Sequence, residues 1–151
     1  MYNNLNKICS LYASDEHLVT MLISYIYEQK NEEKQIITIF EKDLSNFAEK
    51  LLKNIKKEIR NKINWNKTCI NDLKDKLNKN LNGSIIIVNG ENKFINNVNM
   101  ILENLKENFT IVNCFSIFKN ETNIQEILNE YSKILTTQGI EEIKKVITCN
   151  V

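Results

Sequence analysis

Glycine is scarce in this chain of 151 residues, with single residues at Gly83, Gly90 and Gly139 only. A phosphate-binding loop needs glycines, so that backbone N–H groups can converge on the phosphate, together with a lysine and a hydroxyl group. None of the three glycines follows the first predicted strand, where a mononucleotide-binding protein carries that loop, and no GxGxxG pattern occurs. The sequence therefore predicts no P-loop and no nucleotide hydrolysis.

Metal-ligating and nucleophilic patterns are also missing. The chain has one histidine and four cysteines, Cys9, Cys69, Cys114 and Cys149, which lie far apart with no CxxC pair. Zinc sites use clustered cysteines or several histidines, so no metal site is expected. No GxSxG nucleophile motif occurs, and no catalytic residue is assigned. We expect the four thiols to be reduced, and those in apolar strand-like segments to be buried.

Long apolar segments and an excess of charge are absent as well. No stretch approaches the roughly 20 apolar residues that cross a bilayer, and the first residues lack the features of a signal peptide. We therefore expect a cytoplasmic protein with no membrane partner. Twenty basic and nineteen acidic residues give a net charge of +1, which provides no overall attraction to nucleic acid. The lysines of residues 50–79, with Trp65 among them, are interpreted as solvated helix faces, so nucleic-acid binding is not expected.

What the sequence does contain is an alternation of strand and helix patterns. Residues 84–88 (SIIIV) are continuously apolar, which is typical of a central strand covered on both faces. The pattern predicts strands at residues 7–13, 35–41, 84–88, 109–118 and near the C-terminus at 145–151. It predicts helices at 15–33, 43–55, 71–81, 93–106 and 123–135, with a helical turn after Gly139. Residues 56–68 fit either a longer helix or a short strand.

Alternating strands and crossover helices form parallel sheets with helices on both faces. The expected fold class is therefore α/β: a single domain over residues 1–151, built as a three-layer α/β/α sandwich around a mostly parallel sheet of about five strands.

Ligands of such sheets bind beyond the carboxyl ends of the strands. The loops at that edge are residues 13–17, 41–43, 89–92 and 116–123. The acidic residues Asp15, Glu16, Glu41, Asp43 and Glu91 could converge at this edge and bind a cation or a basic ligand. Helix capping explains Asp15 and Asp43 equally well, and His17 fits a polar residue in the first turn of a helix. The candidate ligand-binding residues are Tyr12, Asp15, Glu16, His17, Glu41, Asn89, Gly90 and Glu91.

Two parts of the chain resemble the MEDS domains, the sensory domains of methanogen, methylotroph and DcmR-type regulators. The first is LYASDEHLVTMLISYIYEQKNEEKQIITIF, and the second is the strand that leads into GEN, followed by a helix ending in LENLKENF and a strand with Cys114. The resemblance implies a RecA-like or Rossmann-like core without a working P-loop, used as a regulatory sensor.

These observations favour a non-catalytic regulatory or sensory domain that binds a small molecule or a protein partner at the carboxyl edge, without a cofactor. One alternative is a small enzyme whose pocket uses Asp15, His17, Glu41 and Glu91. The other is a structural subunit of a homo-oligomer, and homodimerisation stays open in every case.

Overall fold

The computed structural model describes residues 6–29, 34–53, 55, 57, 61–118 and 123–143. Strands and helices alternate along most of this part of the chain, as expected from the sequence. The strands are β1 (Asn6–Tyr12), β2 (Ile36–Phe40), β3 (Ile85–Asn89), β4 (Thr110–Ser116), β5 (Lys133–Thr136) and β6 (Gly139–Glu142). The helices are α1 (Asp15–Glu28), α2 (Ser45–Leu51), α4 (Ile70–Leu77), α5 (Asn92–Glu103) and α6 (Ile124–Glu130).

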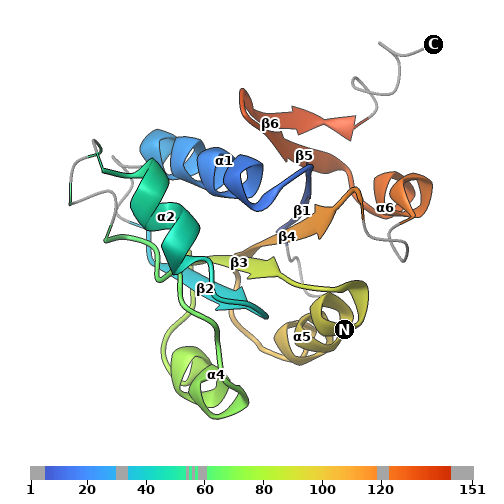
Figure 1. The fold of residues 1–151 in the computed structure, drawn as a ribbon. Helices are drawn as coiled ribbons and strands as arrows, with labels where there is room; N and C mark the ends of the chain where they lie inside the picture. Colours follow the sequence, from blue (N-terminus) through green and yellow to red (C-terminus); the bar gives the residue numbers. More distant parts are fainter. Residues whose placement is uncertain are drawn as a thin grey trace.

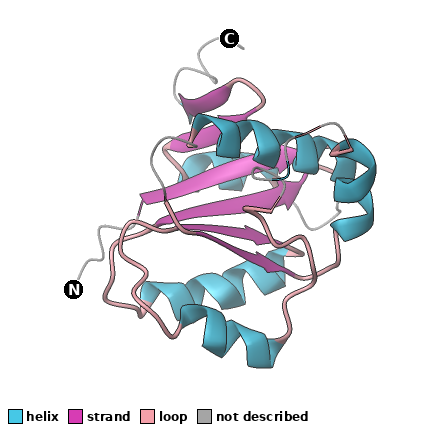
Figure 2. Ribbon diagram, turned by 90° about the vertical axis from the view of Figure 1, so that its left-hand side faces the viewer, coloured by secondary structure: helices cyan, strands magenta, loops and turns pink. Residues whose placement is uncertain are grey.

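The strands form one sheet in the order β2-β3-β4-β1-β5-β6. All neighbouring pairs are parallel except β5–β6, which is antiparallel. Helices α1 and α2 cover one face, and α4, α5 and α6 cover the other (Figures 1 and 2). The predicted three-layer α/β/α sandwich with a mostly parallel sheet is confirmed, with six strands in the described part of the chain rather than about five.

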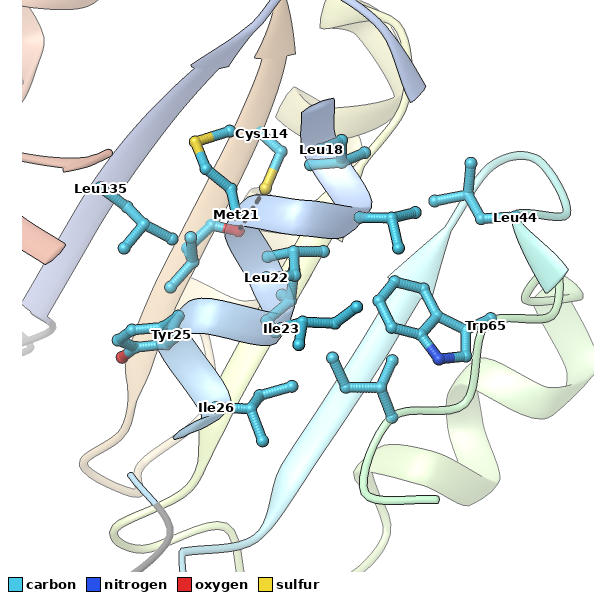
Figure 3. Close-up of a cluster of buried hydrophobic side chains, with 14 of the residues drawn as sticks. Leu18, Met21, Leu22, Ile23, Tyr25, Ile26, Leu44, Trp65, Cys114 and Leu135 are labelled. Atoms are coloured by element: carbon cyan, nitrogen blue, oxygen red, sulfur yellow. Dashed lines mark hydrogen bonds between the residues drawn. The ribbon is translucent and has the colours of Figure 1, made fainter. Parts of the chain in front are cut away.

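Strand β3 shows how the sheet separates two hydrophobic cores. Side chains alternate between the faces of a strand, so Ile85 and Ile87 enter the core under α1 and α2, while Ile86 and Val88 enter the core under α4, α5 and α6. All four side chains are at most 1% exposed. Figure 3 shows the first of these cores, in which the α1 side chains pack toward the sheet and Trp65. The continuous apolar pattern of β3 therefore follows from burial on both faces.

The predicted helix at residues 123–135 is wrong at its C-terminal end. Asn123 does cap α6, because its Oδ1 accepts a hydrogen bond from the N–H of Glu126 at 3.2 Å. However, α6 ends at Glu130, and β5 continues the sheet beside β1. Ile134 and Leu135 alternate between the two cores, a period-two pattern that is hard to recognise in a strand of four residues.

A helical turn was predicted after Gly139, but Gly139–Glu142 form β6; Ile143 is helical, and the residues after it lie outside the described part of the chain. The φ of Gly139, 116°, lies in the region that favours glycine, and the residue belongs to the tight β5–β6 connection. The strand predicted at residues 145–151 lies outside the described residues.

The other helices are shorter than predicted. Helix α1 ends at Glu28 and α2 spans only Ser45–Leu51, where residues 15–33 and 43–55 were expected. Asp43 does not occupy the N-cap position of α2, but its carboxylate accepts a hydrogen bond from the N–H of Ser45 at 2.8 Å. Helix α4 ends at Leu77 instead of residue 81.

The described part of the ambiguous segment, residues 61–68, lies beside the edge strand β2 instead of forming a further strand. The N–H of Thr68 donates to the carbonyl of Phe40 at 2.9 Å, and the Thr68 hydroxyl accepts from the N–H of Phe40 at 3.1 Å. The ammonium group of Lys76 donates to the carbonyl of Thr38 at 2.7 Å. These contacts occupy backbone groups of β2 that could otherwise pair with another chain.

Cys9 and Cys114 are fully buried on opposite faces of the sheet, whereas Cys69 is exposed at the start of α4. All three are free thiols, and Cys149 lies outside the described residues. Burial raises the pKa of the Cys9 thiol to about 12, and it also raises the pKa of Cys114.

Thiol reactivity tests this arrangement. In a Cys149→Ser variant at pH 8, we expect a disulfide reagent to modify Cys69 rapidly, because the thiolate is the reactive form and Cys69 is exposed. Cys9 and Cys114 should react only after denaturation. Adding Cys69→Ser should abolish the rapid phase, and rapid modification of more than one thiol in the native protein would contradict the described core.

Candidate functional site

The carboxyl ends of β1 and β4 mark the point at which the chain connections diverge. These two strands are neighbours, but β1 leads into α1 on one face of the sheet and β4 leads into α6 on the other. Open α/β sheets bind ligands in the crevice outside such a switch point. The topology therefore predicts a binding site at the same loops as the sequence, residues 13–17, 41–43, 89–92 and 116–123.

A cavity of about 220 Å³ lies at this position. We call it the edge pocket, and it is lined by Tyr12, Glu41, Lys42, Asn89, Gly90, Glu91 and Ser116. The lining residues come from the ends of β1, β2, β3 and β4, which are consecutive in the sheet order. A second cavity of about 390 Å³ shares Tyr12, Lys42 and Ser116 with the edge pocket and extends it toward residues 13–16.

Most of the candidate residues from the sequence meet in these two cavities. The edge pocket contains Tyr12, Glu41, Asn89, Gly90 and Glu91, and the second cavity contains Tyr12, Asp15 and Glu16.

His17 lines neither cavity. Its Nδ1 accepts a hydrogen bond from the N–H of Ala13 at 3.0 Å, and its own N–H donates to the hydroxyl of Ser14 at 3.1 Å. His17 thus takes part in the start of α1, as the first-turn interpretation expected.

Sequence reasoning missed two pocket residues, Lys42 and Ser116. Both belong to loops that were considered, but neither residue carries a motif that would separate it from an ordinary loop residue. Their role in the lining follows from the strand order, which brings the end of β4 next to β1 and the end of β2 next to β3. The sequence did not reveal that order.

Asn89 is the most constrained polar residue of the edge pocket. It is fully buried, and its Nδ2 donates to the Tyr12 hydroxyl at 2.7 Å and to the carbonyl of Cys114 at 3.2 Å. The amide orientation follows from the Cys114 carbonyl, which can only accept. Among the described residues, Asn89 Oδ1 has no hydrogen-bond partner. A buried acceptor without a donor costs about 1–3 kcal/mol, so Asn89 carries an unsatisfied oxygen in the described part of the chain.

Tyr12 supplies a hydrogen-bond donor next to Asn89. Burial raises the pKa of the Tyr12 hydroxyl to about 12, despite the hydrogen bond from Asn89, which lowers it. The phenol therefore stays protonated at neutral pH. Because its oxygen accepts from Asn89, its own proton is available for another acceptor.

A carboxylate contact holds the β2 end of the pocket against α5. Glu41 Oε1 accepts a hydrogen bond from the N–H of Glu91, the residue before α5, at 2.7 Å. A Cβ atom at Gly90 would lie 2.8 Å from this oxygen and 2.6 Å from the ring of Phe94. Only glycine fits at this position without a shift of its neighbours, which makes the close approach of Glu41 possible.

An ion pair joins the loops after β1 and β2. Lys42 Nζ lies 2.7 Å from Asp15 Oδ1 and 3.0 Å from Oδ2, at a half-exposed position. An exposed pair of this kind contributes at most about 1 kcal/mol, so it orients Lys42 more than it stabilises the fold.

The site does not have the features of a metal or phosphate site. Within the described ranges, no group of three or more histidine, cysteine or acidic side chains is arranged to hold a metal ion. No glycine-rich turn precedes α1, where Asp15 and Glu16 occupy the first turn.

Trp65, the aromatic residue of the lysine-rich segment, is 8% exposed and stacks on Phe40 with ring centroids 6.2 Å apart. Its ring is therefore mostly part of the core (Figure 3), and the residue also lines a cavity of about 490 Å³ beside α2. In the described part of the chain, the helices are too short or too polar to cross a bilayer.

Comparison with known proteins gives no relative: no family model, curated protein or solved structure matches this chain. What the fold and the site define is a class, an α/β domain with a mostly parallel sheet and a small pocket at its switch point, lined mainly by polar residue types.

Replacing Tyr12 by Phe tests the buried pair with Asn89. Because the pKa of Tyr12 is raised from 10 to about 12 in the folded state, its contribution to stability is complete below pH 10 and is lost as the pH rises toward 12. We expect Tyr12→Phe to lower the free energy of unfolding by about 1 kcal/mol at neutral pH, the value for one buried hydrogen bond. Above pH 10, the free energy of unfolding of this variant should fall less steeply than that of the wild type.

The measurement is urea unfolding between pH 7 and pH 11.5. Tyr27→Phe is the control, because Tyr27 is 40% exposed and lies on α1 away from the pocket lining. Equal pH dependence in the Tyr12→Phe variant and in the wild type would contradict the described environment of Tyr12.

Proposed function

We propose that this chain is a non-catalytic regulatory or sensory domain that binds a small ligand, or a group presented by a protein partner, in the edge pocket. The observation that carries the proposal is the edge pocket, a cavity lined mainly by polar residues from the ends of four adjacent strands, at the edge where open α/β sheets bind ligands.

The position and the size of the pocket support the same proposal. It lies where α/β sheets bind ligands, and its volume of about 220 Å³ suits a molecule smaller than a typical cofactor. The resemblance of the sequence to MEDS sensory domains favours a regulatory role, which stays a prediction, as does the cytoplasmic location inferred from the sequence.

The enzyme alternative has less support from the geometry. It relies on His17 as an acid or base beside Asp15, Glu41 and Glu91. In the described structure the Nδ1 of His17 accepts from a backbone N–H at the start of α1, and the residue does not line the pocket. A general base must lie within hydrogen-bonding reach of its substrate, so a substrate in the edge pocket would have to be reached from outside its lining.

Native mass spectrometry of the purified protein tests the proposal. We expect a co-purified small molecule or a defined complex, and weaker retention of it in a Glu91→Ala variant. The side chain of Glu91 makes no capping hydrogen bond, so the free energy of unfolding of this variant should lie within about 0.5 kcal/mol of the wild-type value.

Glu49→Ala is the matched control, since Glu49 is an exposed carboxylate on α2 outside the edge pocket. Equal retention in the wild type, in the Glu91→Ala variant and in a variant with Asp15, Glu41 and Glu91 all replaced would show that the binding surface lies elsewhere. Magnesium-dependent ATP hydrolysis that is lost in these variants would defeat the non-catalytic assignment.

A further inference from the structure

The charge of this chain is distributed unevenly, with a strongly basic segment at residues 50–68. Basic residues outnumber acidic ones seven to one in this segment, which gives it a charge of +6 in a chain whose net charge is +1. The rest of the chain therefore carries −5. A concentration of one sign on a nearly neutral protein attracts partners of the opposite charge and speeds their association.

The described lysines of this segment have no acidic partner. Within the part of the chain that the structure describes, no ion pair involves any of them. They are all at least partly exposed, and they are Lys50, Lys53, Lys57, Lys62 and Lys67. The sequence pattern was interpreted as solvated helix faces, but residues 61–68 form turns and irregular structure beside β2. The segment therefore presents its positive charge on an irregular surface.

A cavity of about 490 Å³ lies between α2 and residues 61–66, and we call it the α2 cavity. The apolar part of its lining belongs to the hydrophobic core and consists of Ala48, Leu52, Ile63 and Trp65. Asn61 and Asn66 also line the cavity, and both are exposed. Their side-chain amides make no hydrogen bond within the described residues. The cavity thus combines an apolar floor with free hydrogen-bonding groups.

The lysines flank both walls of the α2 cavity. Lys53 directly follows the α2 wall, and Lys62 and Lys67 belong to or adjoin the segment that forms the opposite wall. The carbonyl of Lys57 accepts a hydrogen bond from the N–H of Asn61 at 2.9 Å, so Lys57 also lies beside this wall. Positive charge, free amides and an apolar floor therefore occur together at one place on the molecule.

We propose that the α2 cavity and its lysines dock an acidic segment of a protein partner, in which one apolar side chain is flanked by carboxylates. The lysines pair with the carboxylates, and the apolar floor takes the apolar side chain. The amides of Asn61 and Asn66 bond N–H and C=O groups of the partner's backbone. Glu49 also lines the cavity, so the partner's carboxylates lie outside it, at the lysines.

This docking surface goes beyond the function proposed for the edge pocket. The α2 cavity and the edge pocket share no lining residue. Binding at the α2 cavity can therefore be measured, and can fail, independently of whatever the edge pocket binds.

Other anionic partners fit this surface less well. Proteins bind single-stranded nucleic acid with basic grooves that also offer open aromatic faces, but Trp65 is only 8% exposed. Helices that lie on a membrane insert several apolar side chains, whereas Leu51 is the one large apolar side chain exposed on α2. A protein segment with one apolar side chain needs neither feature, because the cavity accepts that side chain.

Matched peptides test the proposal on the full chain. Trp65 is the only tryptophan of the sequence, so its fluorescence reports on the α2 cavity. At low ionic strength, we expect the capped peptide Glu-Glu-Leu-Glu-Glu to change this fluorescence in a saturable manner. The peptide Gln-Gln-Leu-Gln-Gln should bind at least about tenfold more weakly, because it has lost every charge contact. Glu-Glu-Ser-Glu-Glu should also bind more weakly, and added salt should weaken the binding of both acidic peptides.

Two double variants separate docking at this surface from attraction by net charge. Lys53→Gln with Lys67→Gln should weaken binding of the acidic leucine peptide about tenfold, since it removes a charge on each side of the cavity. Lys93→Gln with Lys106→Gln is the matched control, because it removes the same charge from two exposed lysines on and after α5. The control should leave binding unchanged.

Several results would overturn the proposal. Equal binding of the glutamate and glutamine peptides would exclude the lysines as the contact, and an equal effect of the two double variants would indicate general attraction. Oligothymidylate of the same charge, or vesicles containing phosphatidylserine, binding as tightly as the acidic leucine peptide would assign the surface to another polyanion. Failure of that peptide to bind at millimolar concentration would also contradict the proposal.

Discussion

The fold depends on one constraint, the burial of a parallel sheet on both faces. The interior strand β3 has no face on which a polar side chain could reach solvent, and its side chains from Ile85 to Val88 are all apolar. Two helical layers are needed to cover them, and the crossover connections supply those layers. The first polar side chain along β3 is Asn89, at the carboxyl end of the strand. The candidate site thus lies at this end because the preceding side chains of the strand are enclosed by the two cores.

Sequence reasoning succeeded where burial leaves a long and unambiguous pattern. Residues 84–88 could be recognised as a central strand, and the helices facing the two cores repeat their apolar positions at helical spacing. It failed at residues 133–135, because Ile134 and Leu135 continue a helical pattern from α6 and become a strand only by pairing with β1. That pairing is a tertiary interaction, and no local signal in the sequence encodes it.

The site could be predicted in part for a related reason. Residues at the carboxyl ends of strands meet at one edge whatever the strand order, so Tyr12, Glu41 and Asn89 could be proposed together. Which ends become neighbours depends on the order of the strands, and so the sequence alone did not distinguish Ser116 and Lys42. It indicated a first-turn position for His17, but not that the N–H of Ala13 would donate to its Nδ1 or that the residue would lie outside both cavities.

The hydrogen bond between Glu41 and the N–H of Glu91 has a mechanical consequence. Glu41 precedes α2, which covers one face of the sheet, and Glu91 precedes α5, which covers the other. One carboxylate therefore connects the entrances of two helices that the sheet otherwise keeps apart. A substitution at Glu41 therefore acts on the starts of both helices at once, on opposite faces of the sheet.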